Sequence, residues 1–314
     1  MVAQTIPVLS LQQFTQGSET MRSRFVRDLG EALQSIGFFA LEQHAVEARL
    51  IQTAYGAAEA FFALPDQAKQ RYEVAELKGQ RGFIRFGKEH AKDHPAPDLK
   101  EFWHMGREQM PPGYPPVLEN LWPKEVPQFR AVMTELYQQL EACATVLLEA
   151  CALFLELPPD FFQTEAIAGS SILRIIHYPP IPEAAPPESL RAAPHEDINL
   201  ITLLCEATDA GLELLQSDGT WLPISTDPGQ IIVDTGDMLQ VLSNGLLKST
   251  THRVVNPQNV RSRRFSMPFF VHPRPQFDLT PLPACFTRTG GVPQFPSQTA
   301  EQYLDQRLRE IGLA

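Results

Sequence analysis

Apolar positions in the first half of the chain alternate between strand-like runs and helical spacing. Residues 6–11 and 38–43 are short apolar runs typical of strands. In residues 22–36, Phe25, Leu29 and Leu33 recur every three to four residues, which predicts an amphipathic helix that ends at Gly37. Helices are also predicted over 47–62 and 126–157. Residues 78–116 are polar and rich in Gly and Pro, and they predict a long loop of the kind that often covers a binding site.

Beyond residue 165 the pattern changes to β-type runs in quick succession, without helices between them. Ser217, Asp218 and Gly219 separate two of these runs and indicate a hairpin. Such closely spaced strands favour an antiparallel sandwich or barrel. The runs occupy 170–178, 198–207, 211–216, 220–224, 230–234, 237–242, 252–255 and 263–272.

The last segment, 297–311, begins with Ser and Thr and carries Glu301 in its first turn, so it predicts a capped helix. No repeat or interdomain linker interrupts the sequence. We therefore expect one mainly β domain with flanking helices, in three parts. These are an N-terminal α/β region (1–164), a β core (165–275) and a C-terminal loop and helix (276–314).

Composition narrows the possible partners. The 314 residues include 26 Lys and Arg against 37 Asp and Glu, a formal net charge of −11, which argues against nucleic acid or an anionic membrane surface. No apolar run approaches the ~20 residues of a membrane span. The four cysteines form no CxxC pair and are expected to be buried in a reducing compartment. These features predict a cytoplasmic protein, and a monomer is the default.

His195, Glu196 and Asp197 carry the sharpest chemical signal. On a strand, positions i and i+2 share a face, so His195 and Asp197 would project together, and His252 begins another predicted strand. Two imidazoles and a carboxylate can hold one face of an Fe(II) ion and leave three positions open. A short HxD pattern also occurs by chance, and the same ligands suit Zn²⁺, so a zinc hydrolase and a metal-free β domain remain alternatives.

Arg264 and Ser266 strengthen the iron interpretation. They follow His252 by twelve and fourteen residues, and the period-two rule places both on one face of a predicted strand. A guanidinium with a neighbouring hydroxyl is well suited to receive a carboxylate. A metal and a carboxylate-bearing cosubstrate could therefore face each other.

Several motifs in this order resemble the isopenicillin N synthase-like family of 2-oxoglutarate/Fe(II)-dependent oxygenases. HEDINLITLL (195–204), GDMLQVLSNGLLKSTTHRVV (236–255) and RRFSMPFF (263–270) are similar to the family's core motifs almost residue for residue. GFFALEQHAV (37–46), FFALP (61–65), DLKEFW (98–103) and HYPP (177–180) resemble its earlier landmarks. The resemblance covers nearly the whole chain.

The resemblance implies a double-stranded β-helix, or jelly roll, with helical flanks. It implies that His195, Asp197 and His252 bind iron, that Arg264 and Ser266 hold the distal carboxylate of 2-oxoglutarate, and that Tyr178 also contacts this cosubstrate. The activity would use O2 to oxidise a C–H bond of a small organic substrate by hydroxylation, desaturation or cyclisation, with succinate and CO2 as coproducts. An iron oxidase of the same family that does not use 2-oxoglutarate remains an alternative.

The sequence departs from the family pattern at one position, and the resemblance does not identify the substrate. Plant members usually have Asn two residues before the tyrosine, whereas this chain has Ile176, so one cosubstrate anchor differs. Arg85 and Phe86, in the segment expected to lie over the mouth of the site, are candidates for substrate contact. Phe270 is a third candidate because an apolar wall suits a site of oxidation. The identity of the substrate is not encoded in any of these motifs.

Overall fold

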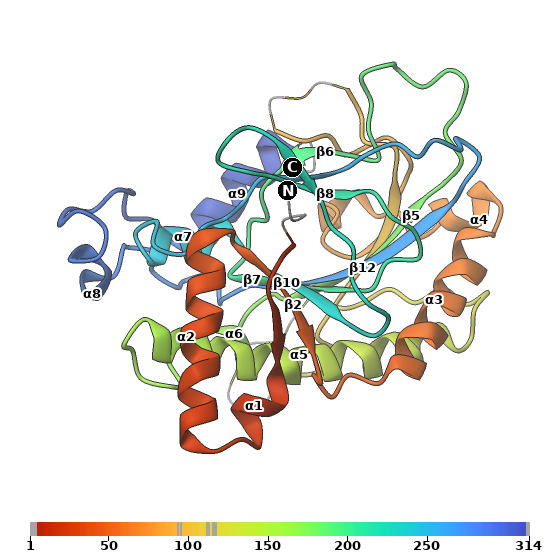
Figure 1. Cartoon of the computed structure of the whole chain (residues 1–314). Helices are drawn as coiled ribbons and strands as arrows, with labels where there is room; N and C mark the ends of the chain where they lie inside the picture. The colour runs from red at the N-terminus through yellow and green to blue at the C-terminus, as the bar shows by residue number, and fades with distance from the viewer. Residues whose placement is uncertain (1–4, 93, 95, 111–113, 115–117, 312–314) are drawn as a thin grey trace.

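The computed structural model describes residues 5–92, 94, 96–110, 114 and 118–311. Two sheets pack face to face, and residues of both line the space between them (Figure 1). The eight-stranded sheet has the order β1 (Val8–Ser10), β2 (Phe38–Glu42), β10 (Ile231–Thr235), β7 (Ile201–Cys205), β12 (Arg264–Val271), β5 (Ile172–Tyr178), β4 (Glu101–Gly106) and β3 (Gly82–Ile84). The four-stranded sheet has the order β6 (Ala192–His195), β11 (His252–Val254), β8 (Leu212–Leu215) and β9 (Trp221–Pro223).

The strand pairs that the structure describes are antiparallel except β1 with β2, and the predicted jelly-roll core is confirmed. The longest helix packs on the outer face of the eight-stranded sheet, against β7 and β12, and two N-terminal helices pack on it in turn (Figure 1). These three are α5 (Phe129–Phe154), α2 (Glu19–Ser35) and α3 (Ala48–Phe62). Phe61, Trp103 and Phe129 join α3, β4 and α5 through tilted and edge-on ring contacts, with centroids 4.9–5.8 Å apart.

The remaining helices are short or peripheral. They are α1 (Leu11–Thr15), α4 (Asp66–Gln70), a 3-10 turn (Ala75–Leu77), α6 (Gln163–Ile167), α7 (Asp237–Leu242), α8 (Pro283–Phe286) and α9 (Ala300–Glu310). The predicted C-terminal cap is confirmed, because Thr299 and Gln302 form a reciprocal capping box at the start of α9. No helix within the described ranges has the length and apolar character to cross a bilayer. All four cysteines are buried and unpaired, as expected.

The prediction of a strand over 237–242 is wrong, because this segment forms helix α7. Met238, Leu239, Val241 and Leu242 are all buried, and a short apolar run of this kind is compatible with either a buried strand or a buried helix. Asp237 in the first turn favours the helix through its interaction with the helix dipole.

The prediction of a continuous loop over 78–116 is also wrong. The segment contains β3 and β4, which extend the large sheet beside β5. Every residue of β4 is buried: Trp103 and Met105 face the helical core, while Phe102 and His104 face the opposite side. Because both faces are covered, the sequence lacks the apolar–polar alternation that marks a half-exposed strand. Residues 93, 95, 111–113 and 115–117 of the expected loop lie outside the described residues.

Candidate metal centre and cosubstrate pocket

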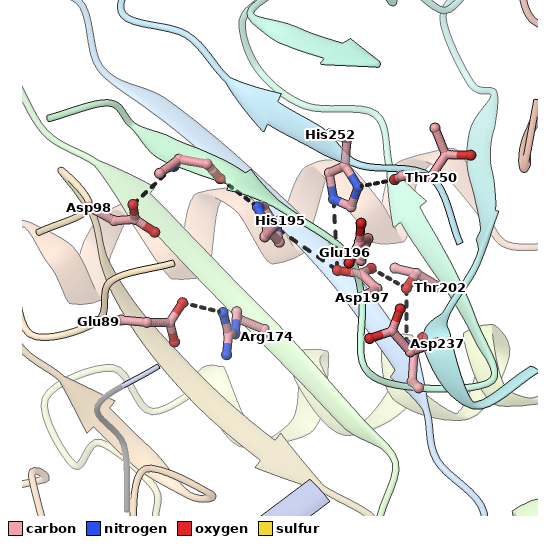
Figure 2. Close-up of polar contacts among 12 residues, drawn as sticks. Glu89, Asp98, Arg174, His195, Glu196, Asp197, Thr202, Asp237, Thr250 and His252 are labelled. Atoms are coloured by element: carbon pink, nitrogen blue, oxygen red, sulfur yellow. Dashed lines mark hydrogen bonds and ion pairs between the residues drawn. The ribbon is translucent and has the colours of Figure 1, made fainter. Parts of the chain in front are cut away.

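Three candidate metal ligands converge at one end of the cavity between the sheets (Figure 2). His195 ends β6 and His252 begins β11, and the two are direct partners in the antiparallel ladder, with ring centroids 4.4 Å apart. Asp197 Oδ1 lies 3.9 Å from His195 Nε2 and 3.7 Å from His252 Nε2. An ion held at ~2.0–2.2 Å from each donor can join atoms at such separations.

Asp197 does not lie on a strand, so the expected period-two arrangement with His195 is not what brings them together. The motif instead forms the corner where the chain passes from β6 in the small sheet to β7 in the large one. The backbone N–H of Asp237, at the start of α7, donates to the carbonyl of Asp197 at 2.7 Å. A Cβ on Gly236 would lie 2.2 Å from the carbonyl oxygen of Asn199, so this close packing requires glycine.

Hydrogen bonds orient all three ligands toward a common point. His195 Nδ1 lies 2.7 Å from the carbonyl of Ala193, and His252 Nδ1 lies 3.1 Å from that of Thr250, so each Nδ1–H donates to backbone. This tautomer leaves both Nε2 lone pairs free for a metal. Burial and the neighbouring His252 lower the pKa of His195 to about 4, which keeps its imidazole neutral. The Thr202 hydroxyl donates to Asp197 Oδ2.

The donor set therefore fits a divalent ion. Two neutral imidazoles and a carboxylate, each held by a backbone or hydroxyl partner, form one face of a coordination sphere. Behind them, burial and the charge of Asp197 raise the pKa of Asp234 well above its ordinary value.

Arg264, Ser266 and Tyr178 line a cavity that begins at this centre. β5 and β12 are antiparallel neighbours in which Arg264 pairs with Tyr178 and Ser266 with Ile176, so the four side chains share the inner face. Arg264 is only 2% exposed, and its guanidinium carbon lies 5.0 Å from the centre of the Tyr178 ring. Its Nε donates to the carbonyl of Asp209 at 3.0 Å. Nη1 is buried with no hydrogen-bond partner among the described residues. A buried unpaired donor of this kind is suited to an anionic ligand.

A second pocket opens on the other side of the metal ligands. It shares Arg174 and Phe270 with the first, so the two pockets meet at these side chains and at the metal centre. Leu304 and Leu308 of α9 cover its outer side. A candidate metal site and a cavity with a buried guanidinium thus lie beside a separate pocket with room for another molecule.

Comparisons with known proteins agree with this geometry. Residues 6–125 match the N-terminal family described as "non-haem dioxygenase in morphine synthesis", and residues 169–273 match the 2OG-Fe(II) oxygenase superfamily. A homoarginine-6-hydroxylase of Oryza sativa is 30% identical over 90% of this chain and 88% of its own length. The chain belongs to the 2OG-Fe(II) oxygenases.

Solved structures of this superfamily have the same fold. A 2OG-Fe(II) oxygenase family protein of Caulobacter crescentus is 41% identical, with a TM-score of 0.84 over 97% of this chain and 98% of that one. A Neurospora crassa protein, solved in complex with alpha-KG and thymine, is 26% identical, with a TM-score of 0.85 over 97% and 96% of the two chains. The expected oxygenase class is confirmed, and neither a zinc hydrolase nor a metal-free jelly roll finds support among these relatives.

The structure brings most of the predicted site residues of this oxygenase together. Besides the metal and cosubstrate candidates, Phe270 lies in both pockets. Arg85 and Phe86 do not lie there: Arg85 is exposed and pairs with Glu73, and Phe86 lines a crevice on the outside of the sheet.

Sequence reasoning missed the polar wall of the second pocket. Glu89, Asp98, Lys100 and His104 fall in the segment that was expected to be loop, and the DLKEFW motif (98–103) includes Asp98 and Lys100 but assigned them no role. Arg174 could have been found, because it lies four residues before Tyr178 on the same face of β5.

Proposed function

We propose that His195, Asp197 and His252 bind the ferrous ion of this oxygenase. The observation that carries the proposal is the meeting of the three donors at one point with both imidazole Nε2 atoms free. His195 is the most exposed of the three, with a side-chain exposure of 31% against 8% for Asp197. The open side of the centre therefore faces the pockets.

Arg264, Ser266 and Tyr178 bind 2-oxoglutarate in the first pocket. The Arg264 guanidinium and the Ser266 hydroxyl receive the distal carboxylate, and the Tyr178 ring covers the guanidinium. The buried Nη1 of Arg264 gains a partner when this carboxylate arrives. Ile176 offers no hydrogen bond where plant relatives have Asn, so the arginine and serine carry the recognition.

The second pocket takes a small organic substrate. When bound, iron with 2-oxoglutarate and O2 supplies the oxidation of a substrate C–H bond, with succinate and CO2 as coproducts. The protein holds both molecules against the metal centre from opposite sides and excludes water with Phe270 and the leucines of α9. Thymine in the complex of the Neurospora crassa relative is an example of a small ligand in this superfamily.

Strands of the N-terminal region support a single oxygenase domain over the whole chain, because β1, β2, β3 and β4 complete the sheet that carries β12. Side chains of β4 also reach the second pocket. The N-terminal region thus contributes to the site and is more than a flanking addition.

The proposal is tested with anaerobic Fe(II) protein and 2-oxoglutarate. A new visible absorption band is expected for wild type, and succinate is expected when O2 is admitted. Asp197→Ala should abolish both, whereas Asp227→Ala, in the loop between β9 and β10, should change neither. Normal succinate formation by Asp197→Ala would contradict the ligand assignment. O2-dependent substrate oxidation without a 2-oxoglutarate band would favour the oxidase alternative.

A further inference from the structure

The wall of the second pocket contains two buried cations and two buried anions that neutralise one another. Lys100 Nζ lies 2.7 Å from Glu89 Oε1 and 2.8 Å from Asp98 Oδ2, and Arg174 Nη1 lies 3.0 Å from Glu89 Oε1. Figure 2 shows Glu89 and Arg174 facing each other below the metal ligands. The side chains of Glu89, Asp98 and Lys100 are at most 7% exposed, and that of Arg174 is 14% exposed. At this depth, an unpaired charge would be costly.

Two buried histidines of this wall, His104 and His272, add no charge. His104 Nε2 accepts a hydrogen bond from Arg174 Nε at 2.6 Å, and its Nδ1 lies 2.6 Å from the carbonyl of Gly79. One nitrogen therefore accepts and the other donates, as in a neutral imidazole. Burial also lowers the pKa of His272 to about 4. Glu196 also lines the pocket, and its charge is paired with the guanidinium of Arg307, 3.8 Å from Oε2.

The metal centre supplies no surplus positive charge either. On the proposed function, Fe(II), the Asp197 carboxylate and doubly ionised 2-oxoglutarate carry two positive and three negative charges, so the complex is negative. A carboxylate on the substrate would be buried beside this centre without a free cation. A cation would face the guanidinium of Arg174 and the ammonium of Lys100 at close range.

Hydrogen-bonding capacity does remain on the same wall, although its charges are paired. Glu89 Oε2 is a buried acceptor with no partner among the described residues. The bonds of Arg174 to the described side chains use Nε and Nη1 and leave Nη2 as a donor. The Phe270 ring lies next to them, with its centre 5.2 Å from the guanidinium carbon of Arg174. A donor, an acceptor and an aromatic face thus line one small cavity of about 100 Å³.

We propose that the primary substrate is a small, uncharged molecule with an amide-type edge, whose N–H donates to Glu89 and whose C=O accepts from Arg174. A flat or apolar part of the same molecule packs on Phe270. The inference rests on the proposed function, because it assigns the second pocket to the substrate of that oxygenase. It goes further in naming the chemical class and two residues that select it.

Benzoate, benzamide and benzamidine test this charge selection, since they share one shape and differ in charge, from anion through neutral molecule to cation. Their binding is measured by calorimetry on the anaerobic Fe(II) protein with 2-oxoglutarate. Benzamide is expected to bind at least about tenfold more tightly than either charged analogue. Tighter binding of benzoate or benzamidine, or no detectable binding of benzamide, would overturn the proposal.

Glu89→Gln provides a second test, because it should shift the binding preference toward the anion. It keeps the shape of the side chain but leaves Lys100 and Arg174 opposite Asp98 alone, so the wall gains one positive charge. The preference for benzamide over benzoate should fall at least about tenfold, and an unchanged preference would contradict the charge argument. Glu149→Gln, at a partly exposed ion pair of α5 with Arg22, is the matched control and should leave the preference unchanged.

The visible band of the Fe(II)–2-oxoglutarate complex is recorded for each protein before binding is measured. If wild type lacks the band, the proposed function fails. If the band is present but the charge preference is absent, only the substrate class fails. The wild-type comparison remains decisive if Glu89→Gln does not fold.

Discussion

Replacing Arg264 by Met gives a quantitative test of the cosubstrate pocket. The guanidinium is 2% exposed, so the carboxylate that it binds also leaves water. Removing one partner of a buried ion pair costs ~3–5 kcal/mol, which corresponds to a roughly 100- to 4,000-fold weaker binding of 2-oxoglutarate. Ser266 still offers its hydroxyl to the carboxylate, but Ile176 supplies no donor that could replace the guanidinium.

Arg264→Lys should give an intermediate result. It keeps the positive charge but loses the planar fork and the Nε bond to the carbonyl of Asp209. Loss of one or two charge-assisted hydrogen bonds at ~1.5–3 kcal/mol each predicts binding weaker by at least about tenfold. An affinity for 2-oxoglutarate that falls from wild type to Arg264→Lys and again to Arg264→Met would show that both charge and geometry contribute.

The assay is an anaerobic titration of each Fe(II) protein with 2-oxoglutarate, followed by the visible band. Arg263→Met is the control, because Arg263 directly precedes β12 and its Nε bonds His177 on the opposite face of the sheet. This variant should bind 2-oxoglutarate as wild type does. If Arg264→Met retained affinity within about threefold of wild type while still binding iron, the cosubstrate assignment would be wrong.

Three further predictions concern the rest of the site. Ile176→Asn should tighten 2-oxoglutarate binding about 2- to 10-fold in the same titration, because it adds one hydrogen bond of ~0.5–1.5 kcal/mol; weaker binding would show that the Asn cannot reach the cosubstrate. Since the pKa of His272 is about 4 when folded and its ordinary value is 6.5, the unfolded chain binds the proton first as pH falls. Wild type should therefore lose about 2 kcal/mol of unfolding free energy between about pH 7.5 and pH 5 through this group, and His272→Gln should show a smaller loss in urea titrations. In the wild type, Arg307 Nη2 lies 2.9 Å from the buried Asp237 carboxylate. Arg307→Met removes this cation and should lower the unfolding free energy by roughly 3 kcal/mol. Arg309→Met, on an exposed face of α9, should change the unfolding free energy little.

The candidate metal and cosubstrate residues were accessible from sequence because each depends on local spacing within a strand or on a motif. Arg264 and Ser266 follow the period-two rule on β12 and share its inner face as expected. His195 and Asp197 do lie together, but for a different physical reason. A corner between two sheets, held by the N–H of Asp237, places the carboxylate, and the period-two rule for strands does not apply there.

The polar wall of the second pocket was not accessible, because its members become neighbours only through long-range pairing. His104 and Arg174 meet because β4 and β5 are antiparallel in one register, and Glu89 reaches them from outside any strand. The same pairing explains the error at 78–116. A strand covered on both faces shows no alternation, and its polar residues then resemble those of a loop although they are buried partners of one another.

The inner face of β12 relates the two halves of the site to each other. β12 carries Arg264 at one end and Phe270 six residues later, with Ser266 between them. At ~3.3 Å per residue, the carboxylate end of the cosubstrate pocket and the aromatic wall are therefore about 20 Å apart. The candidate metal ligands come from the other sheet and its corner, and His195 and Asp197 line both pockets. A change in the register of β12 against β5 would therefore disturb cosubstrate and substrate together. Changes in α9, which covers only the second pocket, should alter substrate binding while the 2-oxoglutarate band stays intact.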